Sequence, residues 1–160
     1  MNATQTDVLL VDDSREDVEL TSHVLRREEL AVSIHIARDD EEALDFLFCR
    51  GTFAERSFDQ PPKVVLLDLK LPKVNGIQVL EQLRRDHRTR FIPVVILSSS
   101  NEECDLVRSY ELGANSYIQK PMDFERFRYT VKTVVLYWLA INHLRPSTRE
   151  YSPPGRVRER

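Results

Sequence analysis

Five polar residues of this sequence stand directly after, or at the end of, strongly apolar runs. They are Asp12, Asp13, Asp68, Ser98 and Lys120. Carboxylates held close together repel one another unless a cation lies among them, and a site made only of oxygen ligands suits Mg²⁺. An aspartate in such a site can act as a nucleophile and form an acyl phosphate. A lysine and a hydroxyl group can then hold the phosphoryl oxygens.

The apolar runs predict the strands that position these residues. Five strand-like runs alternate with helix-like segments, at 8–12, 33–37, 64–68, 93–98 and 116–119. The first and third runs are apolar almost throughout, as expected for strands covered on both faces of a parallel sheet. Five β-α units in a row predict an α/β fold with a doubly wound parallel sheet. Since binding groups of such sheets gather at the carboxyl ends of the strands, the five polar residues should meet at one edge.

Residues that can cap a helix precede the helix-like segments. They are Ser14, Asp39, Asn75, Ser100 and Asp123. The first, second and fourth stand three residues before an acid, which is the spacing of a capping box. The last helix is expected to be the longest, over about residues 124–144.

Length and composition indicate one domain. A chain of 160 residues can bury one core but is too short for two ordinary domains, so we expect one domain at 1–145. Residues 146–160 are rich in proline and arginine and predict a disordered tail.

The net charge of −3 gives no general attraction to nucleic acid or to an anionic membrane. With no apolar run of about 20 residues and no signal-peptide pattern, we expect a cytoplasmic protein. Cys49 and Cys104 match no metal or redox spacing and are expected to be buried free thiols.

The motifs, in this order, resemble those of response-regulator receiver domains. They are Val11-Asp12-Asp13, Leu67-Asp68-Leu69-Lys70-Leu71-Pro72, Asn75-Gly76, Leu97-Ser98-Ser99 and Lys120-Pro121, within about residues 7–144. The resemblance implies a flavodoxin-like, five-stranded sheet of order 2-1-3-4-5. It implies that Mg²⁺ is bound by Asp12, Asp13, Asp68 and the backbone carbonyl of Lys70. It further implies a non-enzymatic signalling domain in which a sensor histidine kinase phosphorylates Asp68.

Further roles follow from the same resemblance. Ser98 and Lys120 would bind the phosphoryl group, and the Lys120-Pro121 bond would be cis, as is usual in the family. Ser98 would move toward the phosphate while Tyr117 rotates inward to fill the vacated space. Lys70, two residues after Asp68, borders the water that hydrolyses the acyl phosphate. We therefore expect its side chain to alter the lifetime of the phosphorylated form; a merely solvated lysine is the alternative.

The last helix predicts a protein interface. Residues 134–141 are apolar on every side, whereas a surface helix needs only one apolar stripe. Trp138 and Ile141 are expected to join the core, while Leu136, Tyr137 and Leu139 remain partly exposed. We predict a homodimer through these three residues, against the alternative that the helix packs entirely onto its own domain.

The choice of partner and of function class leaves alternatives. The long connection at 50–62 and the lengthened last helix resemble stand-alone regulators associated with phytochrome-type kinases, so a bacterial phytochrome is a candidate partner. An aspartate-nucleophile phosphatase would need an acid where Lys70 stands. A nucleotide-binding flavodoxin-like protein would need a phosphate loop where Asp12-Asp13-Ser14 presents negative charge. An intermediate that passes phosphate to a histidine-containing transfer protein has the same chemistry and stays open.

Overall fold

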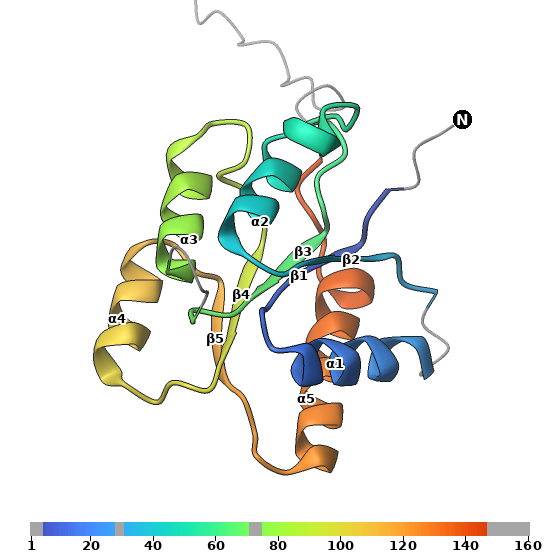
Figure 1. Ribbon diagram of the computed structural model, residues 1–160, viewed down its shortest axis with the longest axis vertical. Helices are drawn as coiled ribbons and strands as arrows, with labels where there is room; N and C mark the ends of the chain where they lie inside the picture. Colours follow the sequence, from blue (N-terminus) through green and yellow to red (C-terminus); the bar gives the residue numbers. More distant parts are fainter. Residues whose placement is uncertain (1–4, 28–30, 71–74, 147–160) are drawn as a thin grey trace, which may run out of the picture.

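A five-stranded parallel sheet forms the centre of the protein. The computed structural model describes residues 5–27, 31–70 and 75–146 of the chain. The strands are β1 (Val8–Val11), β2 (Ile34–Ala37), β3 (Val64–Leu67), β4 (Val94–Ser98) and β5 (Ser116–Gln119). Their order is β2-β1-β3-β4-β5, with every neighbouring pair parallel (Figure 1). The predicted fold class and strand order are therefore confirmed.

Helices cover both faces of the sheet. They are α1 (Arg15–Arg27), α2 (Asp40–Leu47), α3 (Gly76–Arg85), α4 (Glu103–Glu111) and α5 (Phe124–Leu136). A short 3₁₀ turn at Gly51–Phe53 follows α2, and a π-helical turn at Tyr137–Ile141 follows α5. In Figure 1, α1 and α5 lie on one side of the sheet, and α2, α3 and α4 lie on the other. The molecule is thus a three-layer α/β/α sandwich.

Alternation of side chains along each strand gives the protein two hydrophobic cores. In β1, Leu9 and Val11 join the core beneath α2 and α3, while Val8 and Leu10 join the core beneath α1 and α5. All four side chains are almost fully buried. Successive residues of a strand point to opposite faces, so a continuous apolar run is needed where both faces are covered.

Four of the predicted helix caps are confirmed as hydrogen bonds. Asp39 accepts from the N–H of Glu42 at 2.8 Å. Ser14, Asn75 and Asp123 likewise accept a backbone N–H at the starts of α1, α3 and α5. These side chains satisfy backbone donors that have no partner inside the helix.

Ser100 departs from the predicted capping box. Its hydroxyl accepts from the N–H of Glu102 at 3.3 Å and donates to Asp105 at 2.6 Å. The helix then begins at Glu103, with Glu102 as its N-cap residue. Ser100 therefore orders the loop between β4 and α4 rather than the first turn of the helix.

The last helix ends earlier than predicted. The α-helix ends at Leu136, and the π-helical turn ends at Ile141, where the N–H of Asn142 donates to the carbonyl of Tyr137 at 2.7 Å. This bond spans five residues, so the turn is wider than an α-helical one and changes the direction of the following side chains. Ile141 is consequently 61% exposed, and its predicted place in the core is wrong, whereas Trp138 does pack against the core.

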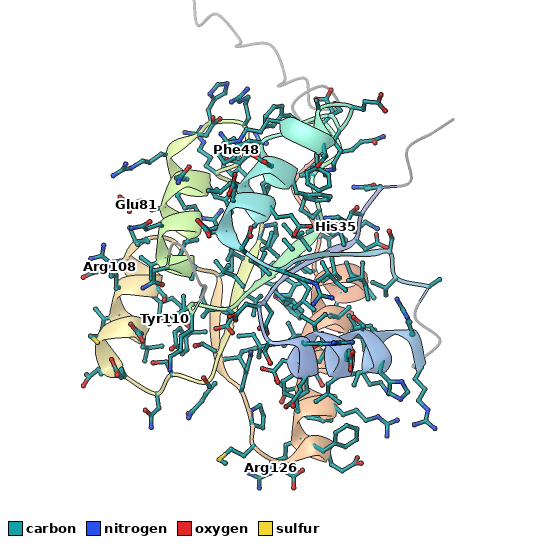
Figure 2. All side chains as sticks on the ribbon, in the orientation of Figure 1. His35, Phe48, Glu81, Arg108, Tyr110 and Arg126 are labelled. Atoms are coloured by element: carbon teal, nitrogen blue, oxygen red, sulfur yellow. The ribbon has the colours of Figure 1, made fainter. Side chains whose placement is uncertain are left out.

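The long connection between α2 and β3 folds back onto α2. Arg56 places its guanidinium 3.6 Å from the centre of the Phe46 ring. The ring of His35, which is labelled in Figure 2, stacks on Phe46 at 4.3 Å between ring centres. The predicted burial of both thiols is wrong: Cys49 is only partly buried at the end of α2, and Cys104 is exposed on α4. No helix in the described ranges is long and apolar enough to cross a membrane. The tail predicted at 146–160 lies, apart from Pro146, outside the described residues.

Candidate functional site

Three carboxylates meet at the carboxyl ends of β1 and β3. Ligand oxygens of Asp12, Asp13 and Asp68 all lie within 4.8 Å of one another. Asp12 and Asp68 are 3% and 8% exposed, and Asp13 faces solvent. We name these three residues the carboxylate cluster. The two strands are neighbours in the sheet, so the apolar runs that bury them also bring the acids together.

Backbone donors hold the two buried carboxylates in place. The N–H of Ser14 donates to Asp12 Oδ1 at 2.9 Å, and the N–H of Lys70 donates to Asp68 Oδ1 at 3.1 Å. Both contacts join an aspartate to the residue two positions later, which is the geometry of an Asx turn. Each buried aspartate therefore keeps its second oxygen, Oδ2, for other partners.

Lys120 faces this cluster from the end of β5. Its Nζ lies 2.7 Å from Asp12 Oδ2, 2.7 Å from Asp17 Oδ2 and 3.1 Å from Asp68 Oδ2. The lysine side chain is 8% exposed. An ammonium group has three N–H donors, and here each of them has a carboxylate partner.

The negative charge of the site exceeds its positive charge. Burial raises the pKa of Asp12 to about 6, although hydrogen bonding to Lys120 acts to lower it. Burial also disfavours the charged form of Lys120, but the hydrogen bonds to Asp12 and Asp17 outweigh this effect and raise its pKa above the usual value. The carboxylates of the cluster repel one another, and a cation bound among them would relieve this repulsion. The oxygen-only ligands, one of them open to solvent, fit a hard divalent cation.

Ser98, Ser100 and Tyr117 form a connected group beside the cluster. Ser98 is fully buried, and its Oγ accepts from the N–H of Ser100 at 3.2 Å. The hydroxyl of Tyr117 donates to the carbonyl of Ser100 at 3.0 Å. Burial raises the pKa of Tyr117 above its usual value, while its hydrogen bond to Ser100 acts to lower it. The serine and the tyrosine singled out by sequence are therefore linked through one loop residue.

Gly76 brings the start of α3 against the end of β3. Its N–H donates to the carbonyl of Leu69 at 2.9 Å. A Cβ atom at this position would lie 2.3 Å from the carbonyl oxygen of Asp68. Only glycine fits this approach without displacing the backbone of the aspartate.

The sequence predictions for the site have mixed outcomes. Asp12, Asp13, Asp68 and Lys120 do meet at one edge of the sheet, and the N–H of Lys120 donates to the carbonyl of Ser98 at 2.7 Å. The cis bond before Pro121 was predicted wrongly, because the described residues contain no cis peptide bond.

The contact of Asp17 with Lys120 was not predicted from the sequence. The position of Asp17, in the first helical turn after the paired acids, was the one feature of the sequence that could have indicated it. Residues 71 and 72 of the motif lie outside the described residues.

A parallel sheet of this order, with acids at the ends of the two central strands and a lysine at the end of β5, defines a class of signalling domains. The family model of the response regulator receiver domain matches residues 8–132. The chain belongs to this family, whose members accept a phosphoryl group and bind a divalent metal ion.

Relatives over most of the chain agree with this assignment. The probable methanogenesis regulatory protein FilR2 of Methanothrix harundinacea is 40% identical over 135 residues, which are 84% of this chain and 84% of that protein. Response regulator Rcp1 of Synechocystis is 34% identical over 132 residues, covering 82% of this chain and 88% of Rcp1.

Solved structures of phytochrome response regulators share the fold. The phosphorylated cyanobacterial phytochrome response regulator RcpA superposes with a TM-score of 0.82 at 33% identity, covering 88% of this chain and 99% of RcpA. The Mn(2+)-bound form of Rcp1 gives 0.80 at 33% identity, with the same coverage. The bacteriophytochrome response regulator AtBRR gives 0.68 at 44% identity, covering 88% of this chain and all of AtBRR. The chain is thus a response regulator receiver with phytochrome-associated relatives.

Proposed function

We propose that Asp68 is the phosphoryl acceptor and that the donor is a phosphohistidine of a sensor histidine kinase. The observation that carries this proposal is the position of Asp68, which is 8% exposed, inside the carboxylate cluster and 3.1 Å from the ammonium of Lys120. A carboxylate oxygen of Asp68 attacks phosphorus while the bond from phosphorus to the histidine nitrogen breaks. The electron pair of that bond stays on the imidazole, which then takes up a proton.

The carboxylate cluster is proposed to hold Mg²⁺. Asp12, Asp13, Asp68 and the backbone carbonyl of Lys70 would be its ligands. A bound Mg²⁺ ion neutralises charge on the oxygens of the transferring group. The cost of burying Asp12 next to Asp68 supports this assignment, because two close carboxylates are stabilised by a shared cation.

Lys120 and Ser98 are proposed to hold the phosphoryl group on Asp68. When Asp68 becomes an acyl phosphate, its carboxylate charge is lost. The N–H of Lys120 that now binds Asp68 Oδ2 can then donate to a phosphoryl oxygen. Ser98 can donate its hydroxyl to another phosphoryl oxygen. A movement of Ser98 would change its contact with the N–H of Ser100, whose carbonyl binds Tyr117. This chain of contacts supports Tyr117 as the residue that reports phosphorylation.

The partner is proposed to be a bacterial phytochrome with histidine kinase activity, in the cytoplasm, where such a kinase has its ATP. This assignment is supported by the similarity to RcpA, a cyanobacterial phytochrome response regulator, and to AtBRR, a bacteriophytochrome response regulator. The protein would act as a signalling domain rather than an enzyme, and we expect no contact with nucleic acid or membrane.

A homodimer through the C-terminal helical segment is part of the proposal. Leu136 and Tyr137 are 37% and 45% exposed, and Leu139 is partly buried against the core beneath α5. Adjacent exposed apolar side chains support an interface. Sedimentation at micromolar concentration, with and without a phosphate mimic, tests this assignment. A monomer in both conditions would defeat it, and Leu136→Glu should weaken a dimer without affecting phosphorylation.

Phosphotransfer from labelled kinases tests the proposed function. A candidate bacteriophytochrome, phosphorylated on histidine, should transfer its label to the wild-type chain and not to Asp68→Asn. Label that persists in Asp68→Asn would overturn the proposal. Adding a histidine-containing transfer protein afterwards distinguishes a terminal regulator, which keeps its label, from a relay intermediate, which passes it on. The rate of label loss from Lys70→Ala tests whether that exposed side chain sets the lifetime.

A further inference from the structure

Asp17 is turned away from helix capping and toward the functional site. Its position three residues after Ser14 suits a capping box, and half of that motif forms, because Ser14 Oγ accepts from the N–H of Asp17 at 3.3 Å. The other half is prevented, since the N–H of Ser14 already donates to Asp12 Oδ1 at 2.9 Å. The Asp17 carboxylate therefore has no donor at the cap and instead binds Lys120 Nζ at 2.7 Å.

Asp17 differs from the other two partners of Lys120. Asp12 and Asp68 belong to the carboxylate cluster, whereas Asp17 does not. A metal ion in the cluster would engage Asp12, and a phosphoryl group would occupy Asp68. Asp17 is then the one partner of Lys120 that neither ligand takes. It lies on α1, and it makes the one hydrogen bond between Lys120 and this helix among the described residues.

We propose that Asp17 is a positioning residue that acts through Lys120 and sets the balance between cation binding and phosphoryl retention at Asp68. This inference rests on the proposed function and extends it to the regulation of the same site. Asp17 occupies one of the three donors of the ammonium group in every state, so fewer remain for the phosphoryl oxygens. Its charge also adds to the negative potential of the cluster.

The two effects have opposite signs for the two ligands. A further carboxylate beside the cluster strengthens the binding of a divalent cation and weakens the binding of an anion. A side chain with a purely structural role would change both affinities in the same direction, because it would alter the population of the folded site. The side chain of Asp17 is 34% exposed, so solvent screens its charge and the effects should be moderate.

The experiment measures two affinities on the whole chain. Calorimetric titration with Mg²⁺ alone gives the cation affinity. Titration with beryllofluoride at saturating Mg²⁺ gives the affinity for a phosphoryl mimic. For Asp17→Asn we expect Mg²⁺ to bind about two- to tenfold more weakly and beryllofluoride to bind more tightly by a similar factor. The phosphorylated variant should lose its phosphoryl group more slowly by the same order.

Two further variants serve as controls. Asp17→Glu keeps the charge and should bring both affinities back toward the wild-type values. Glu16→Gln makes the same change of charge at an exposed position in the same helical turn and should leave both affinities unchanged.

Each outcome decides the question. A loss of both affinities in Asp17→Asn, or no change in either, would overturn the inference while leaving the proposed function intact. A wild-type chain that binds neither Mg²⁺ nor beryllofluoride would overturn the proposed function, and the inference with it.

Discussion

Replacing Asp12 by asparagine should stabilise the metal-free protein. Burial raises the pKa of Asp12 from 3.8 to about 6, a shift that corresponds to about 3 kcal/mol for the cost of its charge at neutral pH. Asparagine has the same shape, can still accept from the N–H of Ser14, and carries no charge. The raised pKa already includes the opposing attraction of Lys120, so we expect a net gain in the free energy of unfolding of about 1–3 kcal/mol.

The dependence of the free energy of unfolding on pH shows whether the charge of Asp12 stabilises or destabilises the folded protein. The folded protein binds a proton at Asp12 more tightly than the unfolded chain does. The Asp12 contribution to stability is therefore present below pH 3.8, is lost between about pH 4 and 6, and is constant above that range. Asp12→Asn lacks this loss, so the difference between the two proteins should be small at pH 4 and reach its full value by pH 7.5.

Urea unfolding in the presence of a chelator measures this difference. Asp86→Asn is a matched control of opposite sign, since hydrogen bonds from Arg88 hold the pKa of Asp86 at about 2 and its removal should cost stability at pH 7.5. Saturating Mg²⁺ should stabilise the wild type more than Asp12→Asn, because binding to the folded state alone adds stability. If Asp12→Asn is less stable than the wild type at pH 7.5 in chelator, the ion pair with Lys120 outweighs burial and the reasoning is refuted.

Three further substitutions test other parts of the account. Gly76→Ala places a Cβ atom 2.3 Å from the carbonyl of Asp68, so it should lower the free energy of unfolding by about 1–3 kcal/mol and reduce phosphorylation; a stable, fully active variant would contradict the close approach. Arg84→Ala removes a side chain that donates to three backbone carbonyls and one side-chain oxygen. It should cost about 2–4 kcal/mol in urea unfolding while leaving phosphotransfer to folded protein unchanged, whereas impaired transfer would refute a purely structural role. Tyr117→Phe removes the 3.0 Å hydrogen bond to the carbonyl of Ser100 and should cost about 1 kcal/mol; an unchanged unfolding midpoint would show that this bond is not stabilising.

The strands and the core of the site could be predicted from sequence for one physical reason. A strand covered on both faces must be apolar throughout, so the polar residue that ends each run also marks the edge of the sheet. Asp12 and Asp68 follow such runs on neighbouring strands and therefore had to meet. The predicted strands differ from the observed ones by at most one residue at an end.

The parts that sequence could not supply depend on competition between partners or on distant contacts. Asp17 fits a capping box, and only the structure shows that Asp12 takes the donor which that box needs. Arg84 binds the carbonyl of Gly113, 29 residues away, and no local pattern indicates this pairing. The end of the last helix was misjudged because residues 134–141 are apolar on every side and give no stripe from which to locate the π-helical turn.

The most direct test of the central claim is to locate the phosphoryl group by mass spectrometry. Cleavage after Lys63 and Lys70 releases a peptide of residues 64–70, in which Asp68 is the one acidic residue. Borohydride reduction converts an aspartyl phosphate to homoserine, and only chains that have been phosphorylated should carry this change. The account predicts homoserine at position 68 after incubation with a phosphorylated histidine kinase. An unmodified 64–70 peptide, with homoserine in the peptide that contains Asp12 and Asp13, would contradict it.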